Sequence, residues 1–392
     1  MKQVKLRPLA YGLAAAASTL FATSAFAQSS VTLYGIVDEA VRYQTNAGVN
    51  GTNLASMGVG VETPSRWGIK GSEDLGNGLS AIFRLESQFN AWNGQLSSSS
   101  SMFSRMAYVG LSSKRYGTVM IGRNQTPFFT QMANVYDPLT VADYWQDSWV
   151  FNGVGPFLTL NNSIKYTNDI GGLHIEGLYA FGNQAGAIGL GAAYGVELQY
   201  TYGPFMLGAG FQQNDVSSIS INNQPASLTK NGAKFNILHV SGNYQITPSI
   251  DLMFGWMHSQ DRTGLTDLDM QQGSAPTLSG VSPNRIDDSF YVGATWQVTQ
   301  PVKLTLAGYY DHARGAECAN GTQCNGVNYS GTLLGEYSFS KRTEIYGTVD
   351  FSRGMGAFAA DYPGMMAPGS SVITGTGRTN NVGVAIGVRN IF

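Results

Sequence analysis

The side chains best suited to chemistry gather in residues 124–160, the longest stretch between strand-like segments in the first half of the chain. A run of acids and aromatics lies within it, comprising Asp137, Asp143, Tyr144, Trp145, Asp147, Trp149 and Phe151. A loop of such length is usually either functional or disordered, and aromatic residues disfavour disorder. We therefore expect a folded loop in which Asp137, Asp143 and Asp147 form an acidic surface.

Cations that could oppose these acids lie on segments in which polar and apolar residues alternate. Each of these cations lies on the polar face of its own segment, and the acid Glu86 lies on the polar face of the segment that contains Arg84. The cations are Arg42, Arg66, Lys70 and Arg84, followed later by Lys165 and Lys303. Basic groups that face acids across a narrow gap create an electric field that sorts ions and orients dipolar solutes. For each cation the alternative is a structural ion pair with a neighbouring acid such as Glu86.

Covalent chemistry finds little support in the sequence. None of the four histidines lies in a recognisable nucleophile or metal motif; they are His174, His239, His258 and His312. Cys318 and Cys324 are the only cysteines, and their spacing in "ECANGTQC" predicts a loop disulfide in an oxidising compartment. A metal site that includes His312 is the minor alternative. We expect no catalytic residue, no cofactor and no bound metal.

The segments that must position these charges have a period of two. In "TEIYGTVDF", the apolar residues Ile345 and Val349 alternate with Thr348 and Asp350, and "VTLYGIVDEAVRY" and "LSAIFRLESQF" follow the same rule. Alternation of this kind marks β-strands that have one apolar and one polar face.

The connections between strands alternate between tight turns, such as "DLGNG", "SKRYG" and "NDIGG", and long polar segments, such as residues 45–62, 92–101 and 214–233. The breaks leave about sixteen strands, each near the length that crosses a bilayer at a tilt. Lipid offers no hydrogen bonds, so a sheet that crosses it must close on itself. The pattern therefore predicts an all-β fold, a 16-stranded antiparallel transmembrane β-barrel. The aromatic residues of the long third loop, residues 124–160, indicate that it is folded into the lumen; the alternative is that it lies over the mouth of the barrel with its acids solvated.

Composition agrees with a single large barrel over residues 28–392. Only 12% of the residues are charged, 49 are glycines, and no linker interrupts the alternation. Residues 1–27 have the features of a secretory signal peptide, with three cations, an apolar core and the cleavage site Ala25-Phe26-Ala27; an N-terminal membrane anchor is the alternative. Without this segment the net charge is −5, which predicts no nucleic-acid binding.

The last strand is apolar to its end. In "NVGVAIGVRNIF", Val384, Ile386 and Val388 share one face with the terminal Phe392. Chain ends usually fray unless something holds them. We expect this strand to close the barrel against the first strand, with Phe392 in an aromatic girdle at the periplasmic interface.

Several motifs resemble the general porins of Burkholderia- and Neisseria-type bacteria over essentially the whole of residues 28–392. They are "SSVTLYGIVD", "SRWGIKGSEDLG", "MAYVGLSSKRYGTVMIGRN", "NNSIKYTND" and "VGVAIGVRNIF". The resemblance implies a homotrimeric diffusion channel of the Gram-negative outer membrane, whose third loop forms the constriction. It also implies that the barrel-assembly machinery reads the C-terminal strand at Phe392, and that the partners are outer-membrane lipids and lipopolysaccharide.

The resemblance and the strand parity disagree at two positions. Arg105 lies in "FSRMAYVGL", where the family carries a pore arginine, but its parity places it outside the barrel, and Arg123 has the same conflict. Family members often carry a further arginine before "NNSI", where this chain has Leu158, Thr159 and Leu160. That departure argues against strong anion selectivity. Glu39 falls on the apolar face of the first strand, where a carboxylate that faces lipid is costly. We expect a trimer interface to cover this position.

The function expected is passive diffusion of small hydrophilic solutes and ions through a water-filled channel. One alternative is a channel that prefers a substrate such as phosphate or sugars and uses the same constriction. A remote alternative is a soluble, secreted carbohydrate-binding β protein, and another is an outer-membrane lipase or protease.

Overall fold

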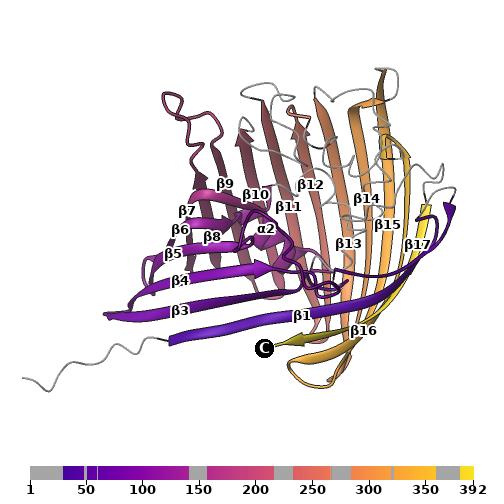
Figure 1. Ribbon diagram of the computed structural model, residues 1–392, viewed down its shortest axis with the longest axis horizontal. Coiled ribbons are helices and arrows are strands. Elements are labelled where there is room, and N and C mark those ends of the chain that lie inside the picture. Colours follow the sequence, from indigo (N-terminus) through magenta and orange to yellow (C-terminus); the bar gives the residue numbers. More distant parts are fainter. Residues whose placement is uncertain are drawn as a thin grey trace, which may run out of the picture.

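The computed structural model describes residues 30–47, 51–59, 61–140, 157–215, 233–264, 266, 284–318, 322–358 and 380–392. Within them the chain forms one antiparallel sheet whose strands neighbour one another in chain order (Figure 1). The strands are β1 (Ser30–Gln44), β2 (Leu54–Val59), β3 (Arg66–Gly76), β4 (Leu79–Gln88), β5 (Met106–Ser113), β6 (Gly117–Gln125), β7 (Thr159–Ile170), β8 (Leu173–Ala180), β9 (Ala193–Tyr202), β10 (Phe205–Asp215), β11 (Lys234–Thr247), β12 (Ile250–Asp261), β13 (Arg285–Thr299), β14 (Val302–Cys318), β15 (Thr322–Ser338), β16 (Thr343–Gly356) and β17 (Asn380–Ile391). Two short helical segments, α2 (Pro127–Gln131) and η2 (Met132–Tyr136), follow β6. None of the helices in the described ranges is long and apolar enough to span a membrane.

The sheet closes on itself where the last strand meets the first. β17 pairs with β1 from Ile391 opposite Ile36 to Gly383 opposite Gln44. Beyond the strand, the Phe392 N–H donates to the Gly35 carbonyl at 3.0 Å, and the Gly35 N–H donates to the Phe392 carbonyl at 2.9 Å. The expected closure is confirmed, and the C-terminus is held in a ladder of backbone hydrogen bonds.

β2 and β3 are two halves of one barrel strand. β2 pairs with the second half of β1, where Leu54 lies opposite Gln44, and β3 pairs with the first half, where Arg66 lies opposite Ile36. Residues 61–65 connect the two halves, and Glu62 within them is buried. The seventeen strand segments of the described chain therefore form the closed 16-stranded barrel that the sequence predicts.

The alternation of faces is also confirmed. On β17 the residues Val384, Ile386 and Val388 are exposed, and on β16 Val349 is exposed while its neighbours are not. The inward Asp350 is only 1% exposed, against 66% for Ile386. Apolar side chains therefore face outward and polar side chains face the interior, which is the arrangement that lipid outside and water inside require.

Candidate pore constriction

The segment after β6 enters the barrel as a short helix. The Thr126 hydroxyl oxygen accepts a hydrogen bond from the Phe129 N–H at 3.3 Å and so caps α2. Pro127 occupies the first turn, where its fixed φ suits a helix start and no hydrogen bond is lost. α2 contacts β8, β9 and β10, and η2 contacts β11 and β12. This half of the predicted loop is therefore folded against the inner wall (Figure 1).

Two inward-facing glycines make room for the loop. A Cβ atom on Gly208 of β10 would overlap the Tyr136 hydroxyl, and a Cβ atom on Gly293 of β13 would overlap the Pro138 ring. Tyr136 is buried, with its ring centroid 6.1 Å from that of His239. Burial raises the pKa of the Tyr136 phenol, so this side chain is neutral where it packs against the wall. The absent side chains thus determine where the loop docks.

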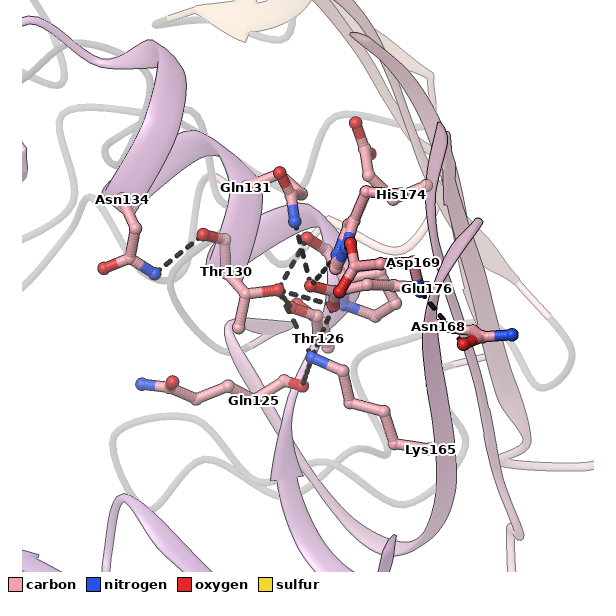
Figure 2. Close-up of polar contacts among 12 residues, drawn as sticks. Gln125, Thr126, Thr130, Gln131, Asn134, Lys165, Asn168, Asp169, His174 and Glu176 are labelled. Atoms are coloured by element: carbon pink, nitrogen blue, oxygen red, sulfur yellow. Dashed lines mark hydrogen bonds and ion pairs between the residues drawn. The ribbon is translucent and has the colours of Figure 1, made fainter. Parts of the chain in front are cut away.

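Glu176 of β8 fixes the loop helix by polar contacts (Figure 2). Its carboxylate accepts hydrogen bonds from the Thr130 hydroxyl at 2.7 Å and the Gln131 amide at 2.9 Å, and it pairs with Lys165 of β7 at 2.6 Å. His174 lies 3.1 Å from the same carboxylate. Figure 2 shows these side chains converging between the helix and the wall. Lys165 faces inward as its parity predicts, but its charge is matched by Glu176.

Asp137 does not form part of an acidic surface open to the lumen, and this prediction is wrong. It is 1% exposed, and its carboxylate accepts hydrogen bonds from the Tyr309 hydroxyl of β14 at 2.6 Å and from the Leu139 N–H at 3.2 Å. The carboxylate turns toward the wall because hydrogen-bond donors that satisfy its charge lie there. The other two predicted acids, Asp143 and Asp147, lie outside the described residues and stay predictions.

Three arginines, on β3, on β4 and just before β5, surround one glutamate of β4, and we call this group the basic wall: Arg66, Arg84, Arg105 and Glu86. Glu86 is buried and pairs with Arg84 at 2.6 Å and with Arg105 at 2.7 Å. Arg66 lies opposite Gln88 in the ladder, and Arg105 donates to Gln88 at 3.0 Å. Arg66 has no ion pair with any side chain in the described ranges. Three cations against one acid leave the basic wall with an excess of two positive charges.

A missing side chain on β3 makes this arrangement possible. Tyr34, Gly68 and Glu86 lie side by side on β1, β3 and β4. A Cβ atom on Gly68 would lie 2.7 Å from the Tyr34 hydroxyl oxygen, so Tyr34 crosses β3 through the gap. Its hydroxyl donates to Glu86 at 2.7 Å and accepts from the Arg84 Nε at 2.6 Å. Glu86 is thus the acceptor that holds the wall together, which matches the alternative of a structural ion pair.

Three other predicted cations occupy different surroundings. Arg42 is 3% exposed and pairs with Asp350 of β16 at 2.9 Å, so it does not face open water as predicted. Barrel closure leaves only β17 between β16 and β1, and no local pattern reveals this neighbourhood. Lys70 is exposed on the inner face of β3, with its Nζ 5.2 Å from the centre of the Tyr34 ring. Lys303 faces inward and pairs with Glu336 at 2.8 Å.

The structure places the two arginines on which parity and resemblance disagree. Arg105 precedes β5, so strand parity does not apply to it, and its side chain turns inward to Glu86. Arg123 lies on β6 opposite Ala107, and it donates to the Ser104 carbonyl and the Asn161 side chain, both at 2.7 Å. Arg105 therefore belongs to the basic wall, and Arg123 ties β6 to its neighbours.

A cavity of about 350 Å³ separates the basic wall from the loop. The three arginines and Glu86 line one side, and Phe129, Asn134 and Thr140 line the other. Arg389 of β17 also lines it, paired with Glu62 at 2.6 Å and Glu344 at 2.5 Å. Sequence reasoning missed Arg389, although its place between Val388 and Asn390 on the inward parity of the last strand could have identified it.

Two further predicted sites lie away from the loop and the basic wall. The backbone of Cys318 ends β14, opposite Thr322, and Cys324 lies on β15, opposite Ala316. Their side chains lie outside the described residues, so the disulfide stays a prediction. Phe392 covers Gly35 with its ring and is partly exposed on the outer face.

A closed barrel with an apolar exterior, a polar interior and a loop folded inside defines a channel protein of the outer membrane. The chain belongs to the Gram-negative porin family, whose family model matches residues 12–357.

Relatives and solved structures agree with this assignment. Outer membrane porin protein 32 of Delftia acidovorans is 28% identical over 94% of this chain and 96% of its own length. An outer membrane porin of Bordetella pertussis is 37% identical, over 40% of this chain and 42% of that protein. An anion-selective porin from Comamonas acidovorans shares the fold, with a TM-score of 0.70 and 22% identity over 93% of this chain and 100% of that one. The protein is an outer-membrane β-barrel porin, and its family is one of channels rather than enzymes.

Proposed function

We propose that the barrel passes small hydrophilic solutes and ions by passive diffusion, through a constriction between the basic wall and the loop. The observation that carries the proposal is the cavity lined on one side by the arginines of the basic wall and on the other by residues of the loop. Conductance through a single channel should rise in proportion to salt concentration. A saturable block by phosphate or a sugar would favour the substrate-preferring channel instead.

The constriction favours anions in this proposal. The basic wall carries an excess of two positive charges, and charges in a narrow, low-dielectric neck act strongly on passing ions. The Comamonas acidovorans neighbour is described as anion-selective, which supports the same sign. Reversal potentials across a bilayer with a salt gradient test it, and a cation-directed potential in the unaltered protein would reject it.

We also propose that the channel works as a homotrimer. Independently, we propose that residues 1–27 are a signal peptide that is cleaved during export. A solved trimer form of OmpT from Vibrio cholerae shares the fold. Glu39 lies on the outer face of β1, and its carboxylate oxygens are already shielded within the chain. A light-scattering mass of one chain in detergent would contradict the trimer. An N-terminus upstream of Gln28 in the purified protein would contradict the cleavage.

Substitution of Glu176 by Gln should loosen the loop. The change leaves Lys165 buried beside a neutral amide, and loss of one partner of a buried pair costs about 3 kcal/mol. We expect a larger and noisier single-channel conductance in planar bilayers. The matched control is Glu73→Gln on the exposed part of β3, which removes the same charge away from the loop. Identical traces for both variants would show that Glu176 does not hold the loop.

A further inference from the structure

Arg389 of β17 borders two cavities, although it is not part of the basic wall. It lines the constriction cavity, and it also lines a second cavity of about 670 Å³, together with Lys341 and Arg342 of the turn between β15 and β16. The tight turns of a porin lie on the periplasmic side, so the second cavity is at the periplasmic end of the barrel. An ion in either cavity therefore feels the charge of Arg389.

Two carboxylates hold the guanidinium of Arg389. It pairs with Glu62 at 2.6 Å and with Glu344 of β16 at 2.5 Å, and its Nη1 donates to the Thr63 hydroxyl at 2.8 Å. The side chain of Glu344 is 14% exposed, against 4% for that of Glu62. Glu344 also lines the second cavity, so an ion there meets both members of the Arg389–Glu344 pair.

The group around Arg389 holds more acid than base. One carboxylate oxygen from each of Glu62, Glu336 and Glu344 lies within 4.8 Å of the others, and we call these three residues the acid cluster. Glu336 of β15 pairs with Lys303 at 2.8 Å, so three acids face two cations. Buried charges need compensation, and one proton shared within the acid cluster restores neutrality.

Hydrogen bonding indicates where that proton resides. The Oε2 atoms of Glu62 and Glu336 are buried and accept no hydrogen bond within the described part of the chain. A protonated carboxyl group donates a hydrogen bond, so a proton on one of these atoms satisfies a neighbouring carboxylate. Glu62 and Glu336 are also the two least exposed members of the acid cluster, and Glu344 is the one that stays ionised beside Arg389.

The other acids that face this region have all their oxygens occupied. The carboxylate of Asp38 on β1 accepts hydrogen bonds from the Tyr346 hydroxyl and the Thr63 N–H, both at 2.6 Å. Across the constriction cavity, both oxygens of Glu86 accept hydrogen bonds from arginines of the basic wall. The unmet acceptors of this region therefore lie in the acid cluster.

We propose that Arg389 is a second selectivity residue of the channel, whose positive charge Glu344 masks near neutral pH and releases in acid. The inference rests on the diffusion channel proposed above. A proton on Glu344 removes the negative charge beside Arg389, which then acts on ions in both cavities. The basic wall supplies a constant attraction, because its surplus charge comes from arginines, which stay protonated. The preference for anions over cations therefore rises as the pH falls.

Reversal potentials of the purified channel in a salt gradient test the proposal. Glu344→Gln should raise the ratio of anion to cation permeability about fivefold, because a unit charge about 8 Å from an ion changes that ratio by this factor even in bulk water. Arg389→Gln should lower the ratio by a similar factor. Glu62→Gln is the matched control, because it changes the other partner of Arg389 but replaces an acid that already holds the shared proton; it should keep the wild-type ratio.

The response of the unaltered protein to pH is the second test. Lowering the pH from about 7 to about 4, where carboxylates titrate, should raise the wild-type ratio, and Glu344→Gln should lose most of this response. If Glu344→Gln keeps the full response, the titrating acid lies elsewhere, for example at Glu86, and the proposal fails. It also fails if Glu62→Gln raises the ratio as much as Glu344→Gln does.

Two further outcomes separate this inference from its alternatives. A wild-type ratio that changes with added calcium at constant pH would place a bound cation in the acid cluster, and this would overturn the release by protons. A cation-directed wild-type potential near neutral pH would reject the anion preference under the proposed function. The differences between wild type and the variants would still decide the role of Arg389.

Discussion

Replacing Arg66 by Ala is expected to lower the channel's preference for anions over cations about thirtyfold. A unit charge about 4 Å from an ion contributes roughly 1 kcal/mol even in bulk water; it attracts an anion and repels a cation by this amount, so the two differ by about 2 kcal/mol. Arg66 is the informative position because it lines the constriction without an ion pair among the described residues. Removing Arg84 or Arg105 would instead leave Glu86 without one of its partners and disturb the wall itself.

The measurement is the reversal potential of purified protein in a bilayer that separates two salt concentrations. Arg66→Lys should keep most of the wild-type potential, and Arg66→Glu should shift it further than Arg66→Ala. Arg115→Ala, at the exposed turn between β5 and β6, controls for the change in net charge. Potentials that coincide for wild type and Arg66→Ala would remove this arginine from the selectivity mechanism.

Deletion of Phe392 is expected to cause a large loss of folded barrel. The residue supplies both hydrogen bonds that extend the β1–β17 seam beyond Ile391, and each contributes about 1 kcal/mol. Its ring also covers Gly35, which has no side chain of its own to shield the seam. We expect a destabilisation of about 3 kcal/mol, because the lost ring packing adds to the two hydrogen bonds.

Two measurements separate the roles of this residue. Refolding yield into detergent micelles reports the seam alone, and the amount of protein in the outer membrane of cells also reports recognition by the assembly machinery. Phe339→Ala is the matched control, because Phe339 is an exposed aromatic in the turn between β15 and β16. If the deleted protein refolds and accumulates like this control, Phe392 neither seals the barrel nor marks it for assembly.

The acids show where sequence reasoning stopped. Strand parity predicts correctly that Glu86 and Asp350 point inward, because successive side chains of a strand must alternate. Strand parity does not predict which side chains these inward acids contact in the interior. Asp350 is paired with Arg42, a residue 308 positions away, and this contact exists only because the ring closes. Asp137 lies in a loop, where no period applies, so its charge and the expected folding of the loop did not reveal which way its side chain turns.

Glycine positions show a similar limit. The sequence has 49 glycines, and nothing local distinguishes Gly68, which lets Tyr34 reach Glu86, or Gly208, which seats Tyr136. Whether a missing side chain becomes a passage depends on the register of the strands beside it. Register depends in turn on the whole ring of hydrogen bonds, so it cannot be inferred from one segment.

The sequence by itself determined the barrel, its strand number, its outward and inward faces and the closing role of the last strand. These follow from a two-residue period that lipid outside and water inside impose on every strand. Only the tertiary structure decided which inward charges face water and which are matched by a partner. It also decided that Arg105 joins the basic wall and that Arg389 lines the cavity. Those outcomes depend on contacts between strands far apart in the chain, and such contacts form only when the cylinder is closed.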